Sequence, residues 1–129
     1  MELRRIRTSE LASAHRLLAE NGWRARLGSV QQFGLLVDAS QVADVAILEG
    51  QVVGFVRAIT DRQSNGYLSM LVVAPTHRGK GIGRQLVERA IGADTGVTWV
   101  LRAGREGAPE FFAKLGFERS SIAMERRRA

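Results

Sequence analysis

The residues with the clearest capacity for chemistry form a glycine-rich segment past the middle of the chain. Glycine at alternate positions leaves backbone N–H groups uncovered where a turn enters a helix, at the positive end of the helix dipole. Such a turn binds a phosphate or a pyrophosphate, and basic side chains beside it suit a ligand with several negative charges. The segment consists of Arg78, Gly79, Lys80, Gly81, Ile82, Gly83 and Arg84.

The spacing of these glycines distinguishes between the known kinds of phosphate loop. A Walker loop has about four residues between its glycines and then Gly-Lys-Ser/Thr, and a dinucleotide loop has Gly-x-Gly-x-x-Gly. This chain has Gly-x-Gly-x-Gly, so neither pattern fits. The alternative to an anion site is a glycine-rich turn with a solvated basic face.

The elements that must position this loop follow from hydrophobic periodicity and turn residues. A strand at Tyr67–Val73 leads into the loop, and a helix at Arg84–Ile91 follows it. Asp61–Gly66 is predicted to be a turn with Asn65-Gly66 at its tip. The other expected strands are Leu3–Arg7, Val42–Leu48, Val52–Thr60, Val97–Leu101 and Phe117–Glu125; the other expected helices start at a cap in Thr8–Glu10, at the capping box Ser29–Gln32 and at Pro109.

The loop and the strand before it resemble a known family. Arg78, Gly81 and Gly83 fill the pattern Gln/Arg-x-x-Gly-x-Gly/Ala, the acetyl-CoA loop of the GNAT superfamily of N-acyltransferases. Leu71, Val73 and Pro75 match the strand that leads into this loop. The expected element order, β-α-α-β-β-β-α-β-α-β, is also that of the GNAT fold. The resemblance therefore covers essentially the whole chain. It implies an α+β (α/β mixed) fold with a central, mostly antiparallel sheet, in a single domain of residues 1–129.

This resemblance implies acetyl-CoA as co-substrate. No metal is expected, because the two histidines, His15 and His77, are far apart in the sequence and lack metal-ligand spacing. The backbone of Leu71, Val72 and Val73 is expected to pair with the pantetheine arm, and the segment 78–84 to hold the pyrophosphate. Arg105 stands where the family often has an asparagine that helps hold the cofactor. Phe112 stands where it often has the tyrosine that protonates the leaving thiolate, and a phenyl ring donates no proton. Both residues are expected beside the cofactor.

The proton chemistry of acyl transfer then has few candidates. Tyr67 is the chain's one tyrosine, and Ser69 is a polar residue within an apolar strand. Alternation along a regular strand predicts that Tyr67, Ser69, Leu71 and Val73 share one face. Tyr67 and Ser69 are the predicted catalytic residues. Asp61 and Glu110 are alternative bases, although a turn aspartate and a helix-start glutamate more often serve the backbone.

The segment between the first two predicted helices, Asn21–Gly28, borders the amine site in the fold that the resemblance implies. It carries Trp23, Arg24 and Arg26, a flat apolar group with two guanidinium groups. That combination suits an acceptor with a carboxylate. The alternative is that this segment has no role in acceptor binding and is a surface loop with a half-buried tryptophan.

Composition limits the other classes of function. The chain has 129 residues, 45% hydrophobic residues and no cysteine, which fits one globular domain without disulfides or a cysteine nucleophile. It has no apolar run long enough for a membrane span and no signal-peptide core near Met1, so a cytoplasmic protein is expected. The net charge of +6 is compatible with nucleic acid, but aromatic residues do not alternate with basic ones as a nucleic-acid surface requires.

The resulting prediction is an N-acetyltransferase that moves an acetyl group from acetyl-CoA to a primary amine by direct attack on the thioester. The acceptor is a small-molecule amine or a protein amino group. The alternative is an acyl-CoA-binding or sensing domain with little or no turnover, because Phe112 replaces the usual acid. A homodimer through the C-terminal strand is common among proteins of this resemblance, so self-association is a further expectation.

Overall fold

A computed structural model describes residues 1–93 and 95–129 as two layers of helices around one sheet. The sheet has the order β1-β2-β3-β4-β5. The pairs β1–β2, β2–β3 and β3–β4 are antiparallel, and β5 runs parallel to β4. The predicted α+β class with a mostly antiparallel sheet is therefore confirmed. The strands are Glu2–Arg5 (β1), Val42–Leu48 (β2), Gln51–Thr60 (β3), Asn65–Val73 (β4) and Thr98–Leu101 (β5).

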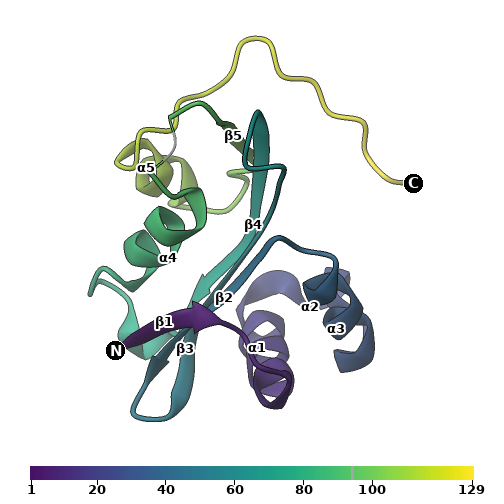
Figure 1. Cartoon of the computed structure of the whole chain (residues 1–129), viewed down its shortest axis with the longest axis vertical. Helices are drawn as coiled ribbons and strands as arrows, with labels where there is room; N and C mark the ends of the chain where they lie inside the picture. The colour runs from purple at the N-terminus through teal and green to yellow at the C-terminus, as the bar shows by residue number, and fades with distance from the viewer. Residues whose placement is uncertain (94) are drawn as a thin grey trace.

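Helices cover both faces of the sheet, as Figure 1 shows, and each face has its own core. The α1–α3 side packs around Phe33 and Phe55, and the α4–α5 side packs around Leu86 and Phe112. Within residues 1–93 and 95–129, no helix has the length and apolar character needed to cross a membrane. The helices are Leu11–Leu18 (α1), Arg24–Leu27 (α2), Val30–Asp38 (α3), Ile82–Ile91 (α4) and Ala108–Ala113 (α5).

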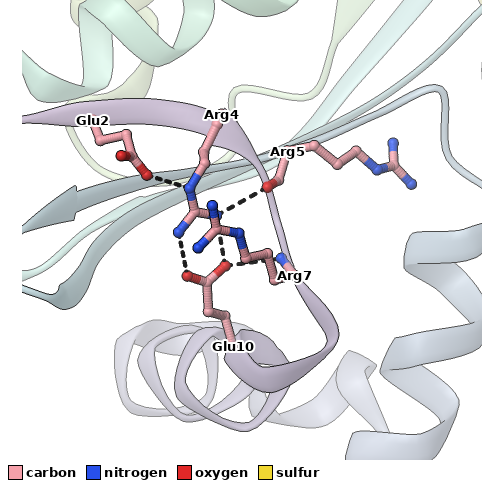
Figure 2. Close-up of polar contacts among 5 residues, drawn as sticks. All are labelled: Glu2, Arg4, Arg5, Arg7 and Glu10. Atoms are coloured by element: carbon pink, nitrogen blue, oxygen red, sulfur yellow. Dashed lines mark hydrogen bonds and ion pairs between the residues drawn. The ribbon is translucent and has the colours of Figure 1, made fainter.

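A cluster of charged residues attaches the start of α1 to the edge strand β1 (Figure 2). Glu10 accepts hydrogen bonds from the Arg4 guanidinium at 2.9 and 2.6 Å and from the Arg7 backbone N–H at 2.8 Å. Arg4 also pairs with Glu2. The hydrogen bond from Arg4 lowers the pKa of Glu10 to about 2, so this carboxylate stays ionised at neutral pH.

The predicted capping box at the start of α3 is confirmed. The Ser29 hydroxyl accepts from the backbone N–H of Gln32 at 3.1 Å, and the Gln32 side chain accepts from the backbone N–H of Ser29 at 2.7 Å. Two N–H groups that the helix itself leaves without partners are thereby satisfied. This cap fixes where α3 begins and hence the length of the segment between α1 and α3.

A bulge in β4 changes which of its side chains share a face. Arg57 pairs with Ser69 whereas Phe55 pairs with Val72, so β4 has one extra residue between them, and Met70 has a φ of 54°. The prediction that Tyr67, Ser69, Leu71 and Val73 lie on one face is wrong for this reason. Leu71 and Val73 pack on the α4–α5 side. Tyr67 and Ser69, which alternate with Leu68 of that same core, point to the α1–α3 side.

The turn between β3 and β4 ends earlier in the chain than predicted, because β4 already begins at Asn65. Asn65-Gly66 is not its tip, because both residues belong to β4 and pair with Thr98 and Trp99. The Asp61 carboxylate instead organises the turn by accepting N–H groups of the next residues. A Cβ at Gly66 would lie 2.5 Å from the Trp99 ring, so this glycine makes room for close packing against β5.

The predicted final strand, Phe117–Glu125, is wrong, because no residue after α5 is in a strand. The Ser120 hydroxyl accepts from the N–H groups of Ile122 and Ala123, which makes a local turn where the strand was expected. Ile122 is 88% exposed and Met124 is 96% exposed. The segment runs past β5 and away from the sheet in Figure 1. The homodimer expected through this strand stays a prediction.

Candidate active site

The site begins where β4 and β5 stop pairing. The two strands pair over Asn65–Leu68 and Thr98–Leu101, and beyond Leu68 no described strand pairs with this edge of β4. A cavity of about 1200 Å³ opens along this edge and is lined from both faces of the sheet. The backbone of Ser69–Val73 has no strand partner on this edge and is therefore available to a ligand, as that of an edge strand is. From β4, the cavity includes Tyr67, Leu68, Ser69, Met70, Leu71, Val72 and Val73.

The first turn of α4 forms one end of the cavity. Gly81 precedes the helix with a φ of 83°, and no side chain of the described residues caps the first N–H groups. Gly79 has a φ of 78°. A Cβ at Gly81 would meet nothing closer than 4.0 Å, so the backbone conformation, rather than crowding by the protein, calls for glycine here. Gly83 differs, because a Cβ there would lie 3.3 Å from Phe111.

The basic residues of the loop divide into two groups. Arg78 and Arg84 line the cavity, and Lys80 does not. Arg78 donates from Nε to the Val73 carbonyl at 2.9 Å and from Nη2 to the Asn21 side chain at 2.9 Å. Arg78 thus ties the end of β4 to the segment after α1 while its charge remains beside the loop. Arg84 pairs with Glu88 at 2.8 Å on the exposed face of α4.

The opposite wall joins two segments that are far apart in the chain. The Arg105 guanidinium lies 3.9 Å from the centre of the Trp23 ring and donates to the Gly22 carbonyl at 3.1 Å. Trp23 and Arg105 both line the cavity, as does Arg26. Arg24 does not, although it was predicted with Trp23 and Arg26. Arg105 therefore contacts the segment expected to border the acceptor.

The two predicted catalytic residues lie together in the cavity wall. Tyr67 and Ser69 both line it, and both point to the α1–α3 side. Tyr67 lies close enough to Arg57 and Arg102 to interact electrostatically with both guanidinium groups. Asp61 does not line the cavity, and hydrogen bonds from Ser64 and its neighbours lower its pKa well below its ordinary value.

Arg57 is a cavity residue that the sequence analysis missed. Its Nε donates to the Ser40 hydroxyl at 2.7 Å, and its side chain is partly buried. Burial lowers the pKa of Arg57, and nearby Tyr67 opposes that effect. A signal was present in the sequence, since Arg57 is the one charged residue in the otherwise apolar run Val52–Ile59.

The C-terminal segment adds charged residues that were also missed. Arg102 and Glu125 line the cavity and form an ion pair at 2.6 Å. Hydrogen bonds from Arg102 and then Arg127 lower the pKa of Glu125 to about 2, which makes it a poor base at neutral pH. Glu106 also lines the cavity.

Phe112 lies at the boundary between the cavity and the core. It is 8% exposed and makes edge-to-face contacts with Phe111 and Phe117, with ring centres 5.0 and 5.6 Å away. These contacts account for an aromatic residue at this position without any proton transfer. Glu110, the other alternative base, is exposed at the start of α5 and does not line the cavity.

Together these features allow three kinds of contact within one cavity. The first turn of α4 suits a phosphate, and the edge of β4 suits an extended chain with amide groups. The wall with Tyr67, Arg57 and Arg105 suits a small polar molecule. Within the described parts of the chain, no group of three or more His, Asp or Glu side chains has a metal-binding arrangement.

Comparison with known sequences gives two matches that bear on this site. The family description of the acetyltransferase (GNAT) domain matches residues 39–119. N-alpha-acetyltransferase MAK3 of Arabidopsis thaliana is 36% identical over 88 residues, which cover 62% of this chain and 46% of that protein. The chain thus spans about half the length of this relative.

Comparison with solved structures shows the same fold over nearly the whole chain. A GNAT-family acetyltransferase structure from Xanthomonas campestris has a TM-score of 0.82 and 22% identity, covering 98% of this chain and 92% of that one. A Trypanosoma brucei acetyltransferase has a TM-score of 0.70 and 26% identity, covering 98% of each chain. Glucosamine-6-phosphate N-acetyltransferase from Arabidopsis thaliana has a TM-score of 0.74 and 18% identity, covering 98% and 97%.

Proposed function

Because the chain belongs to the GNAT acetyltransferase family and is an acyltransferase of that type, we propose that it transfers an acetyl group from acetyl-CoA to a primary amine. The observation that carries this proposal is the continuous cavity that runs from the first turn of α4, along the unpaired edge of β4, to Tyr67. A donor and an acceptor can meet there without a covalent enzyme intermediate.

The residues at the α4 end fit the cofactor half of acetyl-CoA. The uncapped N–H groups from Gly81 onward are free to hold the pyrophosphate, with Arg78 and Arg84 beside them. The edge from Leu71 to Val73 is free to pair with the pantetheine amides. When bound, acetyl-CoA would supply an acetyl group activated as a thioester. Phe112 and Arg105, on the cavity wall, would flank the arm.

The residues of β4 would then perform the proton chemistry. The backbone N–H groups of the unpaired edge are candidates to stabilise the oxyanion that forms at the thioester carbonyl. Ser69 would hold a water that takes the proton from the amine. The Tyr67 hydroxyl would donate a proton to the leaving thiolate, since Phe112 cannot. Direct attack requires positioning and proton transfer but no protein nucleophile.

The acceptor is proposed to be a nitrogen rather than an oxygen. The curated relative is by name an N-alpha-acetyltransferase, which supports an amino group as the acceptor. A small-molecule amine and a protein amino group are both compatible with a cavity that is open to solvent beside Arg26. Since acetyl-CoA is an intracellular metabolite, we place the reaction in the cytoplasm.

The test combines binding with turnover. Acetyl-CoA should raise the melting temperature of the purified protein, because it binds the folded state. Mass spectrometry of a panel of primary amines incubated with acetyl-CoA and protein should then show products heavier by one acetyl group. Binding without any product would favour the alternative, an acyl-CoA-sensing domain. Absence of both binding and products would refute the proposed function.

A further inference from the structure

Arg57 is held in one orientation in the middle of the sheet. Its neighbours on β3, Val56 and Ala58, are fully buried in the core on the α4–α5 side, so the Arg57 side chain projects to the other face. There its Nε donates to the Ser40 hydroxyl at 2.7 Å. Ser40 is itself fixed, because its hydroxyl donates to the Leu36 carbonyl at 2.6 Å.

The outer part of the Arg57 guanidinium has no counter-ion in the described chain. Across residues 1–93 and 95–129, no carboxylate lies within ion-pair distance of it, and neither Nη1 nor Nη2 has a hydrogen-bond partner. Arginine keeps its charge in proteins, and a partly buried charge without a partner is unfavourable. Because Arg57 lines the cavity, a bound anion can supply the missing partner.

The surroundings of Arg57 in the cavity favour the same conclusion. Arg102 lines the cavity too, but Glu125 already neutralises it at 2.6 Å. Among the described residues, Tyr67 is the one whose electrostatic interaction raises the pKa of Arg57, and its side chain is a phenol rather than a carboxylate. Burial lowers the pKa of Arg57, as expected where water and counter-ions are scarce.

We infer that Arg57 binds a carboxylate of the acetyl acceptor, so that the acceptor is a small amine of amino-acid type. This inference rests on the proposed acetyl transfer. The free Nη1 and Nη2 groups match the two oxygens of a carboxylate in a parallel pair of hydrogen bonds. Arg57 is a binding residue and takes no part in bond making.

The position of Arg57 also limits the size of the acceptor. Arg57 pairs with Ser69, and Ser69 is the first residue of the unpaired edge of β4. Adjacent strands lie about 4.8 Å apart, and the Arg57 and Ser69 side chains project to the same face of the sheet, so a compact acceptor is enough to reach from the Arg57 guanidinium to the edge of β4. A free amino acid has both groups on one carbon, whereas the first residue of a peptide has an amide in place of the carboxylate.

The experiment compares free amino acids with their amides as acceptors. Phenylalanine with phenylalanine amide, and leucine with leucine amide, differ in the carboxylate while keeping the side chain. In the wild type, kcat/KM should favour the free acid by at least about tenfold, as expected for charge-assisted hydrogen bonds. Arg57→Met should reduce this acid-to-amide ratio by about 10- to 100-fold. Arg57→Lys keeps the charge but loses the paired geometry, so its ratio should be intermediate.

A matched control separates carboxylate binding by Arg57 from the general effect of removing a positive charge. Arg24 is exposed and outside the cavity, so Arg24→Met should leave the acid-to-amide ratio within about twofold of the wild type. An equal ratio in the wild type and both Arg57 variants would overturn the inference. A wild-type preference for the amides would also overturn it and would point to peptide N-termini as acceptors.

A binding experiment tests Arg57 separately from acetyl transfer. If no amine in the panel is acetylated, the proposed function fails, and Arg57 is judged by binding alone. N-acetylphenylalanine should then raise the melting temperature of the wild type more than N-acetylphenylalanine amide does, and Arg57→Met should remove the difference. Equal shifts from the two compounds would overturn the assignment of Arg57.

Discussion

The guanidinium group of Arg105 stacks on the Trp23 ring at 3.9 Å and joins segments separated by 82 residues. Hydrogen bonds from Arg105 to the Asn21 and Gly22 carbonyls, at 3.4 and 3.1 Å, hold the same two segments together. One segment follows α1 and the other precedes α5, so helices on opposite faces of the sheet are connected across the cavity. We refer to this Trp23–Arg105 contact as the clasp.

The clasp predicts energetic coupling between Trp23 and Arg105. Arg105→Met and Trp23→Leu should each lower the free energy of unfolding by about 1 kcal/mol, and the double variant should lose little more than either one. Denaturant unfolding of the four proteins gives the coupling energy. Arg24→Met, next to Trp23 but outside the cavity, should cost less than about 0.5 kcal/mol. Additive losses in the double variant would show that the stack contributes nothing.

A side chain at Gly81 is predicted to weaken acetyl-CoA binding as well as to strain the backbone. A second glycine with a similar φ, Gly50, separates these two effects. Gly81→Ala and Gly50→Ala both put a side chain at positive φ, 83° and 76°, so each should cost about 1–2 kcal/mol of stability. Gly50 lies in the β2–β3 hairpin, away from the cavity lining, and a Cβ added there would meet no atom within 4 Å. Calorimetry should show acetyl-CoA affinity reduced at least about tenfold in Gly81→Ala alone. Similar affinities in the two variants would argue against a phosphate site at α4.

Tyr67 is predicted to act through its hydroxyl. Tyr67→Phe keeps the ring in the cavity wall and should lower kcat by about 10²–10⁴-fold, with little change in acetyl-CoA affinity. Steady-state kinetics and calorimetry measure the two quantities. An enzyme within about a factor of two of the wild type would mean that solvent protonates the thiolate.

Phe112 is predicted to serve packing rather than proton transfer. Phe112→Leu removes edge-to-face contacts with Phe111 and Phe117 and should lower the free energy of unfolding by about 1–1.5 kcal/mol. Turnover at saturating substrates should stay within about threefold of the wild type. A large loss of kcat in a variant that folds normally would place Phe112 in the reaction itself.

The Glu10–Arg4 pair predicts a defined pH dependence of stability. The pKa of Glu10 is about 2 in the folded protein against an ordinary value of 4.5, so its contribution is present above pH 4.5 and is lost as the pH falls toward 2. Glu10→Gln should be less stable than the wild type by about 1–2 kcal/mol at pH 7, and the difference should shrink below pH 4.5. Unfolding curves at several pH values test this. Glu118→Gln, an exposed site, should show no such dependence.

Short-range rules were enough to predict much of the fold. The Ser29–Gln32 capping box, the strand Val42–Leu48 and the glycine that precedes α4 each follow from residues close together in the chain. The segment before α4 was predicted to be an anion site because its N–H groups are exposed by local geometry alone. Side-chain spacing and local hydrogen bonds act over a few residues, so they can be read from the sequence.

The features that could not be predicted from the sequence depend mostly on pairing between residues far apart in the chain. The bulge at Met70 turns Tyr67 and Ser69 toward the α1–α3 side, and the extra residue that creates it is visible only in the register with β3. The last strand is absent because a local turn at Ser120 takes its place. Arg57 on β3 pairs with Ser69 on the neighbouring strand β4, and this pairing depends on how the whole sheet assembles. Such contacts join parts of the chain that no local pattern relates, so only the tertiary structure brings the cavity residues together.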